Sequence, residues 1–349
     1  MKMHFGVLLG QQSTLPHRRD LAKLGELIRL TEDCGVDAIG TYDTSFIGGD
    51  AYVRATLLAT VCERARVGLR PTNTLTREPQ IMAGFAASLD SLTEGRAFLD
   101  VASGDSAVYN IGLEAATRAR IESYVRCVRE LLRDGESEFE GRGQRIRWHR
   151  DAVRSSVPIS ICAEGPKMLH LAGRIADGVI AGTGLTPEVV SDTIRRVHEG
   201  AQAEGRSPGE VEIWFTTRSS LHLDRETAIG EVHGSISSIL NHAMRFGLEG
   251  KNVPEALQRT VQEYVDGYVL YDHVQNHGEN PRRMEALGLT RYALDRFALA
   301  GTPEDWVERL SALHDAGVRR VWFGPGHYDL DRQIHDMTLF RDRVAPHFQ

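Results

Sequence analysis

The chain has 349 residues, of which 41 are basic and 48 acidic, giving a net charge of −7. No block of like charge is present, which argues against a nucleic-acid-binding surface and against an anionic-membrane surface. The N-terminus lacks the apolar core of a signal peptide, and no apolar stretch is long enough to span a membrane, so we expect a cytoplasmic protein. The four cysteines are far apart and lack a CxxC pair, which argues against a disulfide framework and a metal site.

Short apolar runs, typical of buried strands, alternate with longer segments that carry apolar residues at helical spacing. Strands are expected at residues 4–9, 38–42, 66–70, 97–102, 159–163, 179–181, 211–217 and 319–323. Helices are expected between them, at residues 18–34, 52–64, 79–92, 117–133, 168–175 and 188–205. This order predicts an α/β fold, a (β/α)8 TIM barrel in a single domain of residues 1–349. An open, doubly wound sheet is the alternative.

About a hundred residues separate the seventh and eighth strands, far more than one crossover helix needs. We therefore expect a helical insertion at about residues 224–298, with helices at 227–246 and 254–271. Thr302 and Pro303 mark the N-cap and first turn of a later helix. The insertion is expected to cover the C-terminal mouth of the barrel. It would line a substrate pocket with Tyr268, Tyr271 and His273, unless these side chains lie on a solvated helix face.

Small and polar residues follow two of the predicted strands, at the end where a barrel places its active site. Ser103, Gly104, Asp105 and Ser106 follow the strand at 97–102.

The strand at 159–163 ends in Ala163, Glu164, Gly165 and Pro166. Glycine lets the backbone approach a ligand closely, and proline suits the first turn of a helix. The free N–H groups of that turn are suited to an anion, although an ordinary strand–helix turn has the same pattern.

These two segments, together with residues 301–310 and 316–324, resemble the bacterial luciferase-like flavin-dependent oxidoreductases. Within that superfamily they are most similar to the branch that contains methylenetetrahydromethanopterin reductase, which uses the deazaflavin coenzyme F-420. The resemblance extends from Met3 to about Gly324. It implies a barrel enzyme that holds a flavin-type cofactor at the C-terminal ends of its strands.

The resemblance assigns roles at the end of the second strand. Family members often carry Asp-His there, with the histidine near the central ring of the flavin. This chain has Asp43 followed by Thr44, so histidine-based proton transfer at this position is in doubt. Asp43 is then either a contact of the bound ligand or a cap of the loop.

At the third strand, relatives place a bulge with a non-proline cis peptide bond behind the flavin. The matching bond in this chain is Arg70–Pro71, and we predict that it is cis, because a cis X–Pro bond costs only ~0.5–1 kcal/mol. A trans proline that ends the strand is the alternative. Thr72 and Asn73 would then hydrogen-bond the pyrimidine-like end of the flavin.

Asp105 matches an acidic residue near the reactive centre in the reductase branch. A carboxylate partly desolvated against a ring system has a raised pKa and exchanges a proton during hydride transfer. A cap on the following helix is the alternative role for Asp105. Ser103 and Ser106 would add neutral hydrogen-bond donors.

The turn from Ala163 to Pro166 matches the loop that holds the phosphate of the cofactor in the family. The backbone N–H groups of Lys167 and Met168 are the expected donors. The Lys167 side chain is either a further phosphate ligand or a surface lysine. We expect the Glu164 side chain to turn away from the phosphate, because like charges repel.

The leading function is hydride transfer between reduced coenzyme F-420 and a small organic substrate. The first alternative is an FMN-dependent luciferase-like monooxygenase that uses oxygen and a separate flavin reductase. The second is an accessory homologue that has lost cofactor binding. A homodimer is expected, with no nucleic-acid or membrane partner.

Overall fold

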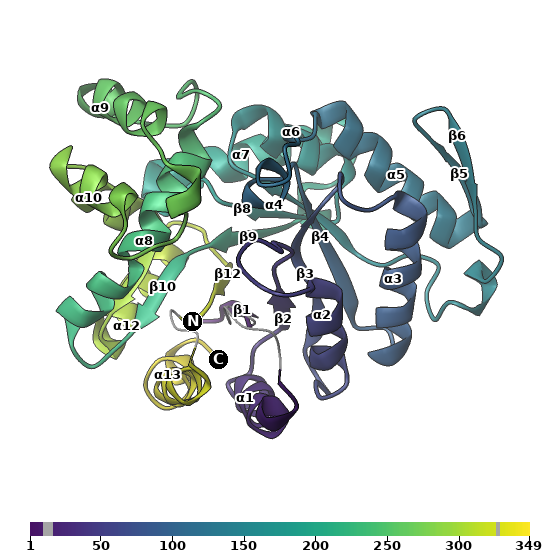
Figure 1. Cartoon of the computed structure of the whole chain (residues 1–349), viewed down its shortest axis with the longest axis horizontal. Coiled ribbons are helices and arrows are strands. Elements are labelled where there is room, and N and C mark those ends of the chain that lie inside the picture. Colours follow the sequence, from purple (N-terminus) through teal and green to yellow (C-terminus); the bar gives the residue numbers. More distant parts are fainter. Residues whose placement is uncertain (10–16, 326–328) are drawn as a thin grey trace.

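The computed structural model describes residues 1–9, 17–325 and 329–349. Eight parallel strands close into a barrel in the order β1-β12-β9-β8-β7-β4-β3-β2, which confirms the predicted TIM barrel (Figure 1). The strands are β1 (His4–Leu8), β2 (Ala38–Thr41), β3 (Arg66–Asn73), β4 (Ala97–Ala102), β7 (Ile159–Ala163), β8 (Gly178–Ala181), β9 (Glu212–Thr216) and β12 (Arg320–Phe323).

The third strand contains the predicted bulge. In the ladder between β3 and β4, Leu69 pairs with Leu99 and Thr72 pairs with Val101. Two residues of β3, Arg70 and Pro71, therefore stand opposite one residue of β4, and β3 runs past the predicted end at residue 70. The Arg70–Pro71 peptide bond is cis, as predicted.

Helices surround the barrel, and their ends follow local sequence signals. They are α1 (Leu21–Asp33), α2 (Ala51–Ala59), α3 (Pro79–Leu92), α4 (Ser106–Tyr109), α5 (Arg118–Asp134), α6 (Pro166–Ile175), α7 (Pro187–Ala203), α12 (Pro303–Asp315) and α13 (Leu330–Arg343). The Thr302 hydroxyl accepts a hydrogen bond from the N–H of Asp305, so the predicted N-cap of α12 is present. Short 3-10 turns occupy Arg18–Asp20, His149–Asp151, Pro208–Glu210, Leu270–Asp272 and Ala345–His347.

The insertion between β9 and β12 contains more elements than the sequence pattern predicts. It holds α8 (Arg225–Met244), α9 (Glu255–Asp266), α10 (Glu279–Ala286) and α11 (Thr290–Phe297). The predicted helix at 254–271 is too long, because α9 ends at Asp266 with Gly267 as its C-cap. A short parallel sheet pairs β10 (Arg218–Leu221) with β11 (Ala298–Gly301). The helices bury their own apolar cluster, which includes Ile236, Tyr264 and Phe297.

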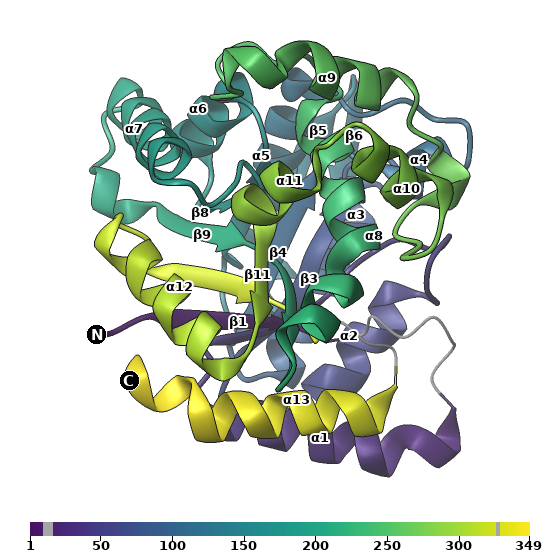
Figure 2. The same cartoon turned by 90° about the vertical axis from the view of Figure 1, so that its left-hand side faces the viewer.

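Figure 2 shows where the insertion lies. The barrel strands run across this view, and α8 and α10 lie beyond the ends toward which their arrows point. At the bottom of the same view α13 lies beside α1, where it closes the barrel wall between the last and first strands. An antiparallel hairpin of β5 (Glu136–Phe139) and β6 (Arg142–Arg145) projects after α5. None of the helices within the described ranges is long and apolar enough to cross a membrane.

Candidate active site

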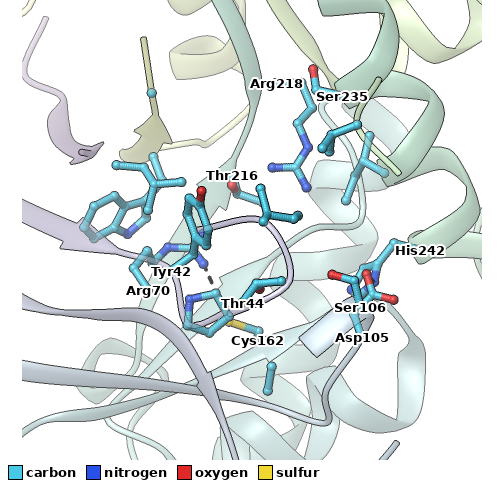
Figure 3. A pocket seen from close by; sticks show the side chains of 18 of the residues that line it. Tyr42, Thr44, Arg70, Asp105, Ser106, Cys162, Thr216, Arg218, Ser235 and His242 are labelled. Carbon is cyan, nitrogen blue, oxygen red and sulfur yellow. Dashed lines mark hydrogen bonds and ion pairs between the residues drawn. The ribbon is translucent and has the colours of Figure 1, made fainter. Parts of the chain in front are cut away.

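A cavity of about 290 Å³ opens at the C-terminal ends of the barrel strands, under the helical insertion (Figure 3). Pockets of this size and position hold small molecules in barrel enzymes. Many of the residues predicted from strand ends line it. They are Asp43, Arg70, Pro71, Thr72, Asn73, Gly104, Asp105, Ser106, Glu164 and, from the insertion, His273.

One wall of the cavity is a hydrogen-bonded group next to the β3 bulge. The Asp43 carboxylate accepts a hydrogen bond from the Thr72 hydroxyl at 2.7 Å and from the Tyr52 hydroxyl at 3.3 Å. Burial raises the pKa of Asp43, although these hydrogen bonds oppose the shift. The cap of α2 is Asp50, whose side chain accepts from the N–H groups of Tyr52 and Val53. Asp43 is therefore a wall residue of the cavity, and its role as a contact of the bound ligand stays a prediction.

Thr72 and Asn73, the residues predicted to contact the flavin ring, differ in which hydrogen-bonding groups remain free to bind a ligand. The Thr72 hydroxyl proton is directed to Asp43. The Asn73 side-chain oxygen accepts from the N–H groups of Leu75 and Thr76, which fixes the loop after β3. The Asn73 Nδ2 group has no hydrogen-bond acceptor among the described residues, and Asn73 lines the cavity. Asn73 is thus the donor available to a ligand on this wall.

On the opposite wall, four charged side chains form a cluster of Asp105, Glu164, His242 and Arg245. Figure 3 shows two of them, Asp105 and His242, side by side. His242 comes from α8 and lies between two carboxylates. Its Nδ1 is 2.8 Å from Asp105 Oδ2, and its Nε2 is 3.1 Å from Glu164 Oε1. Arg245 binds the second oxygen of Asp105 and donates to the carbonyl of Gly104 at 3.2 Å. With His242 protonated, two cations balance two anions.

The cluster keeps its proton on His242. Burial alone would lower the pKa of His242, but the carboxylates of Glu164 and Asp105 outweigh it and raise the pKa to about 9. Burial alone would raise the pKa of Asp105, but His242 and then Arg245 hold it well below its ordinary range. The predicted raised pKa of Asp105 is therefore wrong, because that prediction did not include the two cations. Asp105 also makes no side-chain hydrogen bond as a cap of α4.

Backbone geometry presents Asp105 to the cavity. Gly104, between β4 and α4, has a φ of 99°, and a Cβ there would approach Val108 Cγ2 to 2.7 Å. Only glycine fits this turn without strain. The strand end is thereby turned so that Asp105 and Ser106 line the cavity.

One of the two backbone N–H groups expected to bind the phosphate, that of Met168, is already used within the turn. The N–H of Met168 donates to the carbonyl of Gly165 at 3.1 Å, so it is not free for a ligand. The Lys167 side chain is exposed and lies outside the cavity. The cation beside Gly165 is Lys251, whose Cε would lie 3.6 Å from a Cβ added at that glycine. Lys251 is buried, its Nζ donates to the carbonyl of Ala243 at 2.6 Å, and burial lowers its pKa to about 8.

Glu164 lines the cavity, and its carboxylate is directed to His242. His242 compensates its charge, and the nearby N-terminus of α6 also favours a carboxylate. That this side chain turns away from a bound phosphate stays a prediction. Gly165 itself is the N-cap of α6 and has no capping side chain.

Some predicted residues lie outside the cavity. Tyr271 is 84% exposed, because α9 has already ended before it, and its ring packs near Phe46 on the surface. Tyr268 supports the cavity indirectly, since its hydroxyl is 2.7 Å from His273 Nδ1. Ala163 is buried in the barrel core, and the side chain of Ser103 does not contribute to the cavity wall. Gly165 and Pro166 line a smaller recess beside the cavity.

Sequence reasoning missed three charged residues of this site, His242, Arg245 and Arg218. His242 and Arg245 lie in the insertion, far from any barrel strand end, whereas Arg218 directly follows β9 and could have been found from its strand-end position. His242 lies in α8, Arg245 is the C-cap of that helix, and Arg218 begins β10. The two α8 residues reach the cavity only because the insertion lies over the barrel. Within the described ranges, no three His, Cys, Asp or Glu side chains converge to hold a metal ion.

Comparisons with known proteins agree with this geometry. Residues 1–320 match the family described as luciferase-like monooxygenase. The chain is 27% identical over 350 residues to 5,10-methylenetetrahydromethanopterin reductase of Methanopyrus kandleri, covering 94% of this chain and 95% of that protein. It is 30% identical over 343 residues to an F-420-dependent glucose-6-phosphate dehydrogenase of Mycolicibacterium fortuitum, covering 93% of each.

A solved structure has the same fold. The coenzyme F-420 dependent tetrahydromethanopterin reductase from Methanopyrus kandleri matches with a TM-score of 0.75 and 23% identity, covering 100% of both chains. Sequence and fold together identify the chain as an enzyme of the luciferase-like monooxygenase family.

Proposed function

We propose that this enzyme transfers a hydride between the deazaflavin coenzyme F-420 and a small organic substrate. The observation that carries the proposal is the position of His242 between the carboxylates of Asp105 and Glu164, with all three side chains lining the cavity. Reducing a C=O or C=N bond by hydride requires a proton as well, and this cluster holds one beside the cavity. The named dependence of several relatives on F-420 supports the choice of hydride donor.

The residues present fit such a cofactor. Arg70 and Pro71 of the β3 bulge line the cavity where they would back a ring system, and Asn73 Nδ2 is a free donor for a ring carbonyl. The uncapped N-terminus of α6, with Lys251 beside Gly165, suits a phosphate. When bound, the deazaflavin supplies the hydride. The protein supplies the wall, the anion site and the proton.

The charge balance of the cluster makes proton transfer reversible. In the reductive direction the substrate atom that gains electron density takes the proton from the cluster through a carboxylate oxygen of Asp105 or Glu164. The cluster is then left with one excess negative charge, which it loses by taking a proton from solvent. In the oxidative direction the same groups accept the proton of an alcohol or amine.

Cofactor preference tests the proposal directly. We expect the purified chain to bind F-420 more tightly than FMN, measured by titration with absorbance and fluorescence detection. A dissociation constant for FMN about tenfold lower than that for F-420, which corresponds to ~1.4 kcal/mol, would favour the FMN-dependent monooxygenase instead. No measurable binding of either cofactor would support the accessory homologue without cofactor.

The phosphate site has its own test. We expect Lys251→Gln to raise the dissociation constant of the preferred cofactor about tenfold, because a buried cation next to the α6 N-terminus is lost. Lys167→Gln, on the same turn but exposed, is the matched control and should leave the affinity unchanged. Equal affinities of the two variants would show that the phosphate lies elsewhere.

A further inference from the structure

One cation of the cavity, Arg218, is not accounted for by the cofactor or by the proton. Arg218 begins β10, two residues after the end of β9, and lines the cavity. Figure 3 shows its guanidinium pointing from the strand into the cavity, toward Thr216. The side chain thus enters the space above the strand ends, where a substrate would lie.

The other cavity cations have anionic partners. Arg70 lies 3.5 Å from Asp100, and His242 lies between Asp105 and Glu164. For Arg218, within residues 1–9, 17–325 and 329–349, no side chain makes a hydrogen bond or ion pair with the guanidinium. The nearby polar groups of β10 are already engaged, since Ser219 bonds Gly324 and Ser220 bonds Glu231.

Arg218 is half-buried, and its guanidinium faces the cavity without an anionic partner among the described residues. Desolvation, followed by the repulsion of Arg70, lowers the pKa of Arg218 to about 10, so the group is still charged at neutral pH. A cation that lines a functional cavity without an anionic partner is suited to bind an anionic group of a ligand.

We propose that Arg218 binds the carboxylate of the substrate, so that the substrate class is a small organic carboxylate with its reducible or oxidisable carbon directed toward the Asp105–Glu164–His242–Arg245 cluster. The proposal rests on the function proposed above. A planar guanidinium matches a carboxylate with two parallel hydrogen bonds. A single unpaired cation balances one negative charge, which favours a carboxylate over a phosphate dianion.

Calorimetric titration of the cofactor-free full chain tests this without any turnover, so that its failure is distinct from failure of the hydride-transfer proposal. The probes are benzoate, the neutral isostere benzamide, and phenyl phosphate. We expect benzoate to bind, and Arg218→Gln to raise its dissociation constant at least about tenfold while the weak binding of benzamide stays unchanged. Arg218→Lys should recover only part of the affinity, because the planar fork is lost.

Arg126→Gln removes the same charge from the exposed face of α5 and should behave as the unmodified chain. Benzoate binding that is equal in the Arg218 and Arg126 variants would overturn the proposal, as would tighter binding of phenyl phosphate than of benzoate.

The melting temperature provides a second readout, because removing a ligand-binding arginine and removing a structural arginine change it in opposite directions. Without ligand, Arg218→Met should raise the melting temperature, since an unpaired cation is replaced by an apolar side chain of similar length. A lower melting temperature would mean that Arg218 holds the fold together and would contradict the assignment.

Discussion

Replacing Asp105 by Asn should lower turnover by about 100-fold or more while leaving the affinity for the cofactor nearly unchanged. Asn cannot carry the negative charge that faces both His242 and Arg245, so the pKa of His242 falls and Glu164 alone is left to hold its proton. We expect the loss of activity to be accompanied by a shift of the alkaline limb of the pH–rate profile toward lower pH. Turnover with any active substrate and NMR titration of His242 measure the two effects.

The matched control is Asp50→Asn. Asp50 caps α2 and Asn caps helices equally well, so this variant should retain both stability and turnover. Unchanged turnover in Asp105→Asn, with a His242 pKa that does not move, would show that Asp105 is not part of the proton relay.

The barrel was predictable because its signal is local. Buried parallel strands give continuous apolar runs, and β4 and β7 begin and end where those runs do. The β3 bulge was predicted from the family resemblance, and the low cost of a cis bond before proline supported Arg70–Pro71 as its position. The elements that escaped prediction, such as β10, β11 and the hairpin β5–β6, are short and carry polar residues, so they have no clear apolar period.

The site was predictable only in part, because some of its contacting residues are far apart in the sequence. Strand ends of a barrel converge whatever their spacing in sequence, and so Asp43, Asn73 and Asp105 were found from the fold together with the family resemblance. His242 and Asp105 are 137 positions apart, and their contact depends on how α8 lies over the barrel. The sequence contains no rule for that placement. The pKa of Asp105 was mistaken for the same reason, because its two cationic partners come from the insertion.

The stability of the enzyme should fall as the pH rises from about 6.5 to about 9, by up to about 3 kcal/mol from His242 alone. The sign follows from the direction of the shift. The folded protein binds the His242 proton more tightly than the unfolded chain, whose histidine keeps its ordinary pKa of 6.5. The stabilisation by the His242 proton is fully present below pH 6.5. It declines between pH 6.5 and about 9, where the histidine loses its proton in the unfolded chain but keeps it in the folded protein, and it is absent above about pH 9. Denaturant unfolding at several pH values measures the slope.

His242→Leu should remove that slope, because it removes the group that titrates. At a pH of about 6 the variant should be less stable than the unmodified chain by about 3 kcal/mol, since Asp105 and Glu164 then share a cavity wall with Arg245 as the only nearby cation of the cluster. At alkaline pH the two proteins should converge. His198→Leu, a half-buried histidine of α7 on the outside of the barrel, is the control and should keep the slope. His242→Gln, which retains a donor for one carboxylate, provides a second variant should the leucine variant not fold. The free energy of unfolding could instead have the same pH dependence in the unmodified chain and in both His242 variants. That result would show that the proton is not held on this histidine.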